Sequence, residues 1–192
     1  MKKDLIRRNI SDSISIKQEL LGNDNLIAEV SKLADLIIEA FNNGNKLLFC
    51  GNGGSAADAQ HLAAEFSGKY YLNRPALHAE ALNTNTSFIT AVANDYSFDE
   101  VYARLIQGIG KKGDVLIGMS TSGNSKNVIK ALEEAKKKEI ITIGLTGKSN
   151  GNMKPYCDYL INIPSDDTPR IQECHLMIGH GICELVEKEL FS

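Results

Sequence analysis

Two side chains that could move a proton, His61 and Glu65, stand four positions apart in this chain. In a helix this spacing puts both on one face, about one turn from each other. An imidazole or a carboxylate in such a pair can act as a general base while its neighbour serves as a partner. The same spacing is typical of an ordinary ion pair on a helix surface, so the pair alone leaves both interpretations open.

The C-terminal segment places further polar residues in an apolar helical pattern. His180 lies in I-G-H-G-I, where each glycine weakens a helix by about 1 kcal/mol, which indicates that something approaches this face closely. Gln172 stands eight positions earlier, about two helical turns, so the two long side chains can converge from one side. His175 is interpreted as a packing or surface histidine.

A third group of candidates is the small-residue turn G-N-G-G-S at residues 51–55, between the apolar run Leu47–Cys50 and an alanine-rich helix that starts at Ala56. A strand, a glycine-rich turn and a helix N-terminus together are typical of an anion site, because free N–H groups and the positive end of the helix dipole meet there. The turn matches neither common nucleotide-binding motif. A packing role alone remains an equal alternative.

A second polar turn, S-T-S-G-N-S, covers residues 120–125. The hydroxyls of Ser120, Thr121, Ser122 and Ser125, with N–H groups at a helix start, suit a phosphate monoester. One of these hydroxyls is expected to cap the helix that follows. A single cap does not require four hydroxyls together, so phosphate binding is the favoured interpretation.

Strands alternate with helices along most of the chain. The pattern predicts strands at 47–50, 77–82, 115–119, 140–145 and 159–163, helices at 88–92, 101–109, 126–138 and 170–191, and turns or loops at 67–75, 83–87, 94–98 and 146–154. This order predicts an α/β fold with a doubly wound, five-stranded parallel sheet. Ligands bind at the carboxyl ends of such strands, so the two polar turns should face one pocket.

Residues 1–43 are predicted to form two helices before the first strand, the second capped by Asp24 or Asn25. Their apolar positions recur at helical spacing. Two helices that precede the sheet have little of it to cover. We therefore expect part of their apolar surface to pack against another subunit.

Composition limits the possible functions. The 192 residues predict a single domain, with 43% hydrophobic and 23% charged residues, which is ordinary for a globular protein. A net charge of −3 gives no electrostatic case for nucleic acid or a membrane surface. No apolar run approaches the ~20 residues of a membrane span, and the N-terminus does not read as a signal peptide.

The four cysteines, at positions 50, 157, 174 and 183, are scattered. They are interpreted as reduced core residues of a cytosolic protein. Structural zinc sites need close Cys or His pairs, so these cysteines do not predict one.

Four motifs, taken together, carry a family resemblance. They are C-G-N-G-G-S-A-A-D-A-Q-H-L-A-A-E-F at 50–66, A-N-D at 93–95, G-M-S-T-S-G-N-S at 118–125 and D-T-P-R-I-Q-E at 167–173. The chain resembles the sedoheptulose 7-phosphate isomerase (phosphoheptose isomerase) branch of the sugar isomerase, or SIS, domain family over essentially its whole length. The resemblance implies a flavodoxin-like SIS domain over residues 1–192, with the N-terminal helical pair at an oligomer interface.

The resemblance also implies an activity and site residues. Sedoheptulose 7-phosphate would become D-glycero-D-manno-heptose 7-phosphate, a precursor of bacterial lipopolysaccharide or capsule heptose, in a cytoplasmic homotetramer. Glu65 would be the base and His180 the acid. The matching zinc ligands are His61, Glu65, Gln172 and His180; the matching substrate contacts are Asn52, Gly53, Gly54, Ser55, Asn94, Asp95, Ser120, Thr121, Ser122, Ser125 and Gln172.

Two other functions occur on similar chains. One is a non-catalytic SIS protein that binds a replication initiator; in such proteins the catalytic set is degraded, whereas Glu65 and His180 are both present here. The other is a sugar-phosphate sensor, which usually has a DNA-binding domain for which 192 residues leave no room. Lys69 stands where relatives often have Arg, which leaves its sugar contact open.

Overall fold

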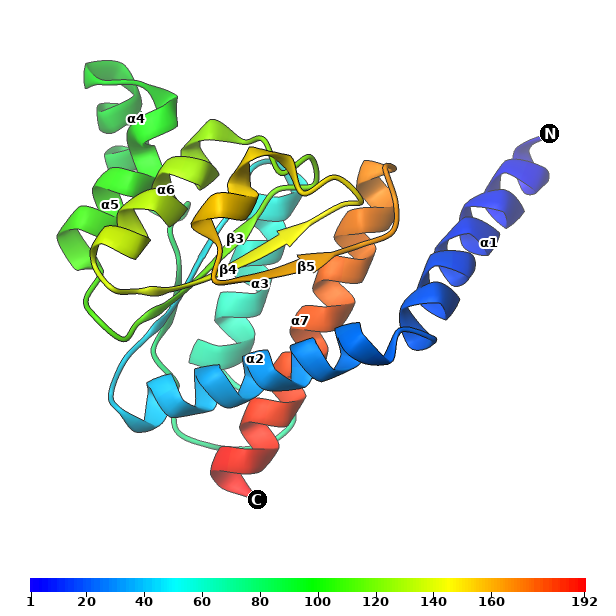
Figure 1. Cartoon of the computed structure of the whole chain (residues 1–192), viewed down its shortest axis with the longest axis horizontal. Helices are drawn as coiled ribbons and strands as arrows, with labels where there is room; N and C mark the ends of the chain where they lie inside the picture. Colours follow the sequence, from blue (N-terminus) through cyan, green and yellow to red (C-terminus); the bar gives the residue numbers. More distant parts are fainter.

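The computed structural model describes residues 1–192 and has a five-stranded parallel sheet at its centre (Figure 1). The strands are β1 (Leu47–Cys50), β2 (Ala79–Ala81), β3 (Val115–Met119), β4 (Ile141–Thr146) and β5 (Tyr159–Asn162). They lie in the order β2-β1-β3-β4-β5. This order and the all-parallel pairing confirm the predicted α/β fold.

Helices cover both faces of the sheet, which makes it doubly wound (Figure 1). One face is covered by α2 (Asp24–Asn42), α3 (Gly54–Ser67) and α7 (Thr168–Phe191); the other by α4 (Thr86–Asp95), α5 (Val101–Ile109), α6 (Lys126–Lys137) and the short helix η2 (Gly151–Tyr156). The short helix η1 (Phe98–Glu100) packs on α4, α5 and α6. Strands packed on both sides must be apolar on both sides, and every residue of β1 and β3 is buried.

The first helix, α1 (Lys2–Leu21), projects from the body of the molecule (Figure 1). Leu5, Ile6, Ile10 and Ile14 on it are 50–60% exposed. By contrast, α2 packs its apolar stripe against α7 and buries Leu33 completely. The predicted helical pair is confirmed; α2 contributes four residues to the core, whereas α1 contributes only Leu20 near its end.

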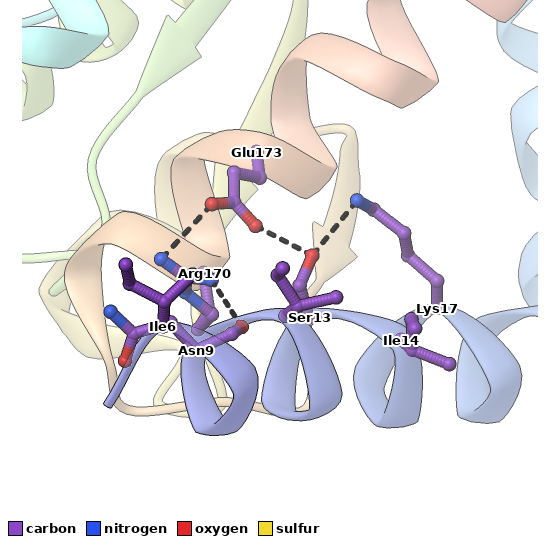
Figure 2. Close-up of a pocket in the computed structure, with 8 residues that line it drawn as sticks. Ile6, Asn9, Ser13, Ile14, Lys17, Arg170 and Glu173 are labelled. Carbon is purple, nitrogen blue, oxygen red and sulfur yellow. Dashed lines mark hydrogen bonds and ion pairs between the residues drawn. The ribbon is translucent and has the colours of Figure 1, made fainter. Parts of the chain in front are cut away.

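Polar contacts attach α1 to the start of α7 (Figure 2). Arg170 donates to the backbone oxygen of Asn9 at 2.8 Å, and its guanidinium pairs with Glu173 at 3.0 Å. Glu173 in turn accepts from the Ser13 hydroxyl at 2.7 Å, and Lys17 donates to that hydroxyl at 2.9 Å. This network fixes the direction in which α1 leaves the body.

Several predicted boundaries were wrong, each for a local reason. Asn23, one residue before the two expected caps, caps α2 by accepting from the N–H of Leu26. The turn expected at 94–98 begins after Asp95, because α4 continues through Asn94 and Asp95. The loop expected at 146–154 contains the start of η2, and β2 is shorter than the predicted strand.

None of the helices combines the length and the apolar character that crossing a membrane would require.

Candidate functional site

The site is built on two neighbouring helices, α3 and α7, which face each other along their length. Gly179 allows the close approach: a Cβ there would lie 2.5 Å from a methyl carbon of Leu62. The neighbouring residues His61 and His180 therefore meet across the contact. The interpretation of the I-G-H-G-I glycines as a close approach is confirmed for Gly179.

Three ionisable side chains form a cluster at this contact. The Nε2 atoms of His61 and His180 lie 2.8 Å apart, so one imidazole can donate to the other. His61 Nε2 lies 3.3 Å from Glu65 Oε1. The three potential ligand atoms all lie within 4.8 Å of one another. The structure thus brings together a pair predicted from one helix and a histidine from a helix more than a hundred residues away.

The cluster faces an open surface. The side chains of His61 and Glu65 are 46% and 23% exposed. Partial burial, helped by the neighbouring His61, lowers the pKa of His180, and Glu65 opposes this shift. A lowered pKa favours the neutral imidazole near pH 7, which is the form that binds a metal ion and exchanges protons with a substrate oxygen.

The donor set fits a zinc ion. Two imidazoles and a carboxylate are ligands that Zn²⁺ accepts, at about 2.0–2.2 Å from each donor atom. The 2.8 Å between the two Nε2 atoms is somewhat less than two ligands of one tetrahedral ion require, so binding would need a small separation of the rings. Gln172 lies further toward the start of α7, where its Nε2 is 3.5 Å from Ser55 Oγ.

The glycine-rich turn lies directly beside Gln172. Gly53 has a left-handed backbone (φ 56°), which glycine adopts without strain. A Cβ on Gly54 would lie 2.6 Å from the Gln172 amide nitrogen. A side chain at position 54 would therefore displace the Gln172 amide from its place beside the turn. The helix begins at Gly54, two residues before the predicted Ala56.

The second polar turn joins β3 to α6 and contains Ser120, Thr121, Ser122 and Ser125. The hydroxyls of Ser120 and Ser125 lie 2.9 Å apart. The expectation that a hydroxyl caps α6 was wrong: Ser125 occupies the N-cap position, but its side chain makes no capping bond. The Ser125 hydroxyl pairs with that of Ser120 instead, which closes the loop on itself. The backbone N–H groups of Lys126 and Asn127, at the start of α6, are therefore left for another acceptor.

The two turns are neighbours because their strands are paired. Cys50 at the end of β1 lies opposite Gly118 near the end of β3. The carboxamides of Asn52 and Asn127 join the two segments with a hydrogen bond in each direction, each 2.8 Å. The prediction that both turns lie at one edge of the sheet is confirmed.

Asn94 and Asp95 lie at the exposed end of α4. Their side chains bond to each other, Asn94 Nδ2 donating to Asp95 Oδ1 at 3.0 Å. They make no hydrogen bond to either turn, so the structure of one chain does not bring them into the cluster.

Sequence reasoning missed the residues that shape the segment between α3 and β2. Glu187 accepts from the N–H groups of Tyr70, Tyr71 and Leu72 and pairs with Arg74 at 2.8 Å. This arrangement holds the Tyr70 ring against that of His180, with centroids 5.7 Å apart and planes at 25°. A signal was available: Glu187 follows Cys183 by four positions, on a face of the helix that is otherwise apolar.

Of the two roles predicted for His175, packing or surface, the structure confirms packing. The residue is fully buried and its Nε2 contacts the backbone oxygen of Thr146 at 3.2 Å. Burial lowers its pKa to about 4, and the contact with Thr146 opposes this shift. His175 therefore stays neutral and takes no part in the cluster.

Comparisons with known proteins agree with this architecture. A family model described as "SIS domain" matches residues 16–147. The chain is similar to "Phosphoheptose isomerase 2" of Campylobacter jejuni, with 54% identity over 97% of this chain and 93% of the relative. Among solved structures it is similar to a phosphoheptose isomerase from Neisseria gonorrhoeae (TM-score 0.91, 40% identity, covering 98% of this chain and 100% of the other) and to one from Francisella tularensis (TM-score 0.94, 34% identity, covering 98% and 99%).

Proposed function

This chain belongs to the phosphoheptose isomerase family of SIS domain proteins, and on that premise we propose that it interconverts sedoheptulose 7-phosphate and D-glycero-D-manno-heptose 7-phosphate. The product would supply heptose for lipopolysaccharide or capsule. The observation that carries the proposal is the cluster of His61, Glu65 and His180, built across two helices beside two polar turns.

The chemistry is the transfer of a proton between neighbouring carbons. Glu65 removes a proton from C1 of the ketose, which is acidic because C2 carries the carbonyl. His180 gives a proton to the carbonyl oxygen at C2, so that a neutral enediol forms. Glu65 then returns its proton to C2 while the hydroxyl at C1 gives a proton back to His180, which produces the aldose and restores both groups. Both groups reach the same small volume, as the pathway requires.

A zinc ion, one per subunit, is part of the proposal, with His61, Glu65, Gln172 and His180 as its ligands. When bound, zinc would stabilise negative charge on the substrate oxygens. A carboxylate bound to zinc is a weaker base, so Glu65 would act as the base when it is not a ligand, and His61, Gln172 and His180 would then hold the ion. His61 would serve as a ligand only.

The substrate would lie between the two turns. Ser120, Thr121, Ser122 and Ser125 would bind the phosphate, with neutral hydroxyl and N–H donors and the positive end of the α6 dipole. The sugar contacts would come from Asn52, Gly53, Gly54, Ser55, Asn94, Asp95 and Gln172. Binding the phosphate at one end fixes the distance from which the carbonyl carbon reaches Glu65.

We also assign the chain to a cytoplasmic homotetramer. The exposed isoleucines and leucine of α1 form an apolar surface, and Leu20, Leu26, Ile27, Met177 and Leu185 line a groove between α1, α2 and α7. A second copy would bury both surfaces and enclose the open cluster. All four cysteines are free thiols, which suits a reducing compartment.

The proposal is tested by incubating the purified protein with sedoheptulose 7-phosphate and separating the sugar phosphates by anion-exchange chromatography. We expect the aldose heptose 7-phosphate to accumulate to equilibrium, and fructose 6-phosphate to give much slower turnover. A protein that binds sedoheptulose 7-phosphate but leaves it unchanged would be a non-catalytic SIS protein, and the isomerase proposal would fall.

The zinc assignment has its own test, with a matched pair of histidines. We expect His61→Ala to reduce zinc in protein purified without chelators to below about a tenth of the wild-type content, since one of the four proposed ligands is lost. His78→Ala is the control, because His78 also contacts a glutamate, at 2.9 Å, on an exposed surface outside the cluster. The zinc content of each variant is measured by inductively coupled plasma mass spectrometry. Equal zinc in His61→Ala and His78→Ala would contradict the assignment of His61 as a zinc ligand.

A further inference from the structure

A buried carboxamide on α6 has no part in the chemistry above. Asn127 is 2% exposed and is the second residue of the helix. Asparagine is a poor helix former. Within its own helix, the Asn127 side chain forms one hydrogen bond, in which the N–H of Val128 donates to Oδ1 at 3.0 Å. Its other hydrogen bonds leave the helix and reach the turn after β1.

Those bonds form a reciprocal pair with Asn52. Asn127 Nδ2 donates to Asn52 Oδ1, and Asn52 Nδ2 donates to Asn127 Oδ1, each at 2.8 Å. A carboxamide has two N–H groups and two acceptor positions on its oxygen. The pair uses one of each on Asn52, so it fixes the plane and the sense of that amide. One N–H and one acceptor position of Asn52 are left at defined places.

The same turn is held from a second side. The Tyr102 hydroxyl donates to the backbone oxygen of Gly51 at 2.6 Å in the core. Hydrogen bonds from α5 and from Asn127 on α6 therefore hold the turn that follows β1. Since Asn127 lies two residues after Ser125, its bonds to Asn52 link the turn at 51–55 directly to the turn at 120–125.

We propose that Asn127 is a positioning residue, which orients the Asn52 carboxamide toward the sugar and sets the distance between the two turns. The proposal rests on the function argued above, in which one turn binds the phosphate and the other the sugar. An error of about 1 Å in placing a reacting carbon can cost about 10²-fold in rate. Asn127 would act through Asn52 and would not touch the substrate.

The test is a double-mutant cycle on kcat and KM for sedoheptulose 7-phosphate. Asn127→Asp keeps the shape of the side chain and the acceptor for Asn52 Nδ2, but it sets an oxygen against Asn52 Oδ1. We expect it to lower kcat/KM about 10–100-fold in the wild-type background and less than about threefold in an Asn52→Ala background, because coupled residues are not additive. Asn127→Ala, which adds no charge, should repeat this pattern and serves if the aspartate variant does not fold.

Inorganic phosphate separates positioning from damage to α6. As a competitive inhibitor it uses the turn at 120–125 but does not need Asn52, so its inhibition constant should change less than about threefold in Asn127→Asp. Weaker phosphate inhibition, in proportion to the loss in kcat/KM, would show that the variant merely disturbs the start of the helix and would overturn the proposal.

Asn45→Ala is the matched control. Asn45 joins the same two strands at their opposite ends, where its Nδ2 donates to the backbone oxygen of Lys112 at 2.9 Å and to Asp114 Oδ1 at 3.3 Å. It should lower the melting temperature and leave kcat/KM within about twofold. Equal losses for Asn127→Asp in both backgrounds overturn the positioning role. If the wild type does not turn over sedoheptulose 7-phosphate, the proposed function is wrong, and the cycle is measured instead on the dissociation constant of this sugar phosphate. In that case, no coupling between Asn127 and Asn52, or no binding at all, also overturns the positioning role of Asn127.

Discussion

At the scale of single residues, the environment of each histidine decides what it can do. His61 and His180 share a half-open volume with Glu65. His175 lies on the same helix as His180, but it is enclosed in the core and contacts only a backbone oxygen. By residue type alone, all three histidines are candidates for the site. Only their burial and their neighbours distinguish His61 and His180, in the cluster, from the packing residue His175.

The buried imidazole of His175 predicts how stability changes with pH. Its pKa is lowered from 6.5 to about 4, so between these values the unfolded chain binds a proton that the folded chain does not. Stability is therefore fully present above pH 6.5 and is lost as the pH falls toward 4, by up to about 3 kcal/mol.

The measurement compares wild type and His175→Gln by urea denaturation at fixed protein concentration, from pH 7 to pH 4.5. The variant should be less stable at pH 7 but lose less stability on acidification than the wild type. Parallel curves for the two proteins would contradict the assignment of this acid sensitivity to His175.

At the scale of elements, the segment between α3 and β2 depends on one buried ion pair. The side chains of Arg74 and Glu187 are each 2% exposed. Burial raises the pKa of Glu187, but the three backbone N–H groups and Arg74 outweigh it, and the net pKa is lowered. The pair connects the end of α7 to the segment that carries Tyr70, whose ring packs against that of His180.

Removing one partner of this pair leaves a buried charge without compensation. We expect Glu187→Gln to destabilise the fold by about 3–5 kcal/mol, measured by urea denaturation at pH 7. Glu184→Gln is the control, since Glu184 forms an exposed pair with Lys188 one turn away, and exposed pairs of this kind contribute about 0.3–0.5 kcal/mol. Similar losses of stability in Glu187→Gln and Glu184→Gln would contradict the structural role assigned to the buried Arg74–Glu187 pair.

The elements also show what the sequence allowed and what it did not. The strands 115–119 and 47–50 were predictable because a short apolar run between polar turns has few other solutions. The partners of Asn127 and Glu187 were not, because each lies more than seventy residues away along the chain. The meeting of His61 with His180 came from the family resemblance, since spacing within one helix cannot reveal a contact between helices.

At the scale of the whole molecule, much of α1 and of the groove beneath it is apolar and exposed. In a monomer this apolar surface would remain exposed to water, whereas an assembly of identical chains can bury it. The cluster of His61, Glu65 and His180 lies open on α3 and α7, which cover the same face of the sheet as α2. If this cluster is the active site, assembly and catalysis should depend on each other.

We expect Ile10→Glu, in the middle of the exposed stripe, to shift the protein from the proposed tetramer of four 21.0 kDa chains to smaller species, because an unpaired charge would be buried on assembly. Sedimentation velocity at micromolar concentration measures the change. Lys3→Glu, also on α1 and exposed, should leave the wild-type tetramer intact. A wild-type monomer would refute the assignment directly.

The roles proposed for Glu65 and His180 are tested by the turnover of sedoheptulose 7-phosphate by Glu65→Gln and His180→Gln, each checked for folding and zinc content. We expect each substitution to lower kcat by about 10²-fold or more, since each removes one of two groups that exchange protons with the substrate. Turnover near the wild-type rate in both variants would contradict the roles assigned to Glu65 and His180.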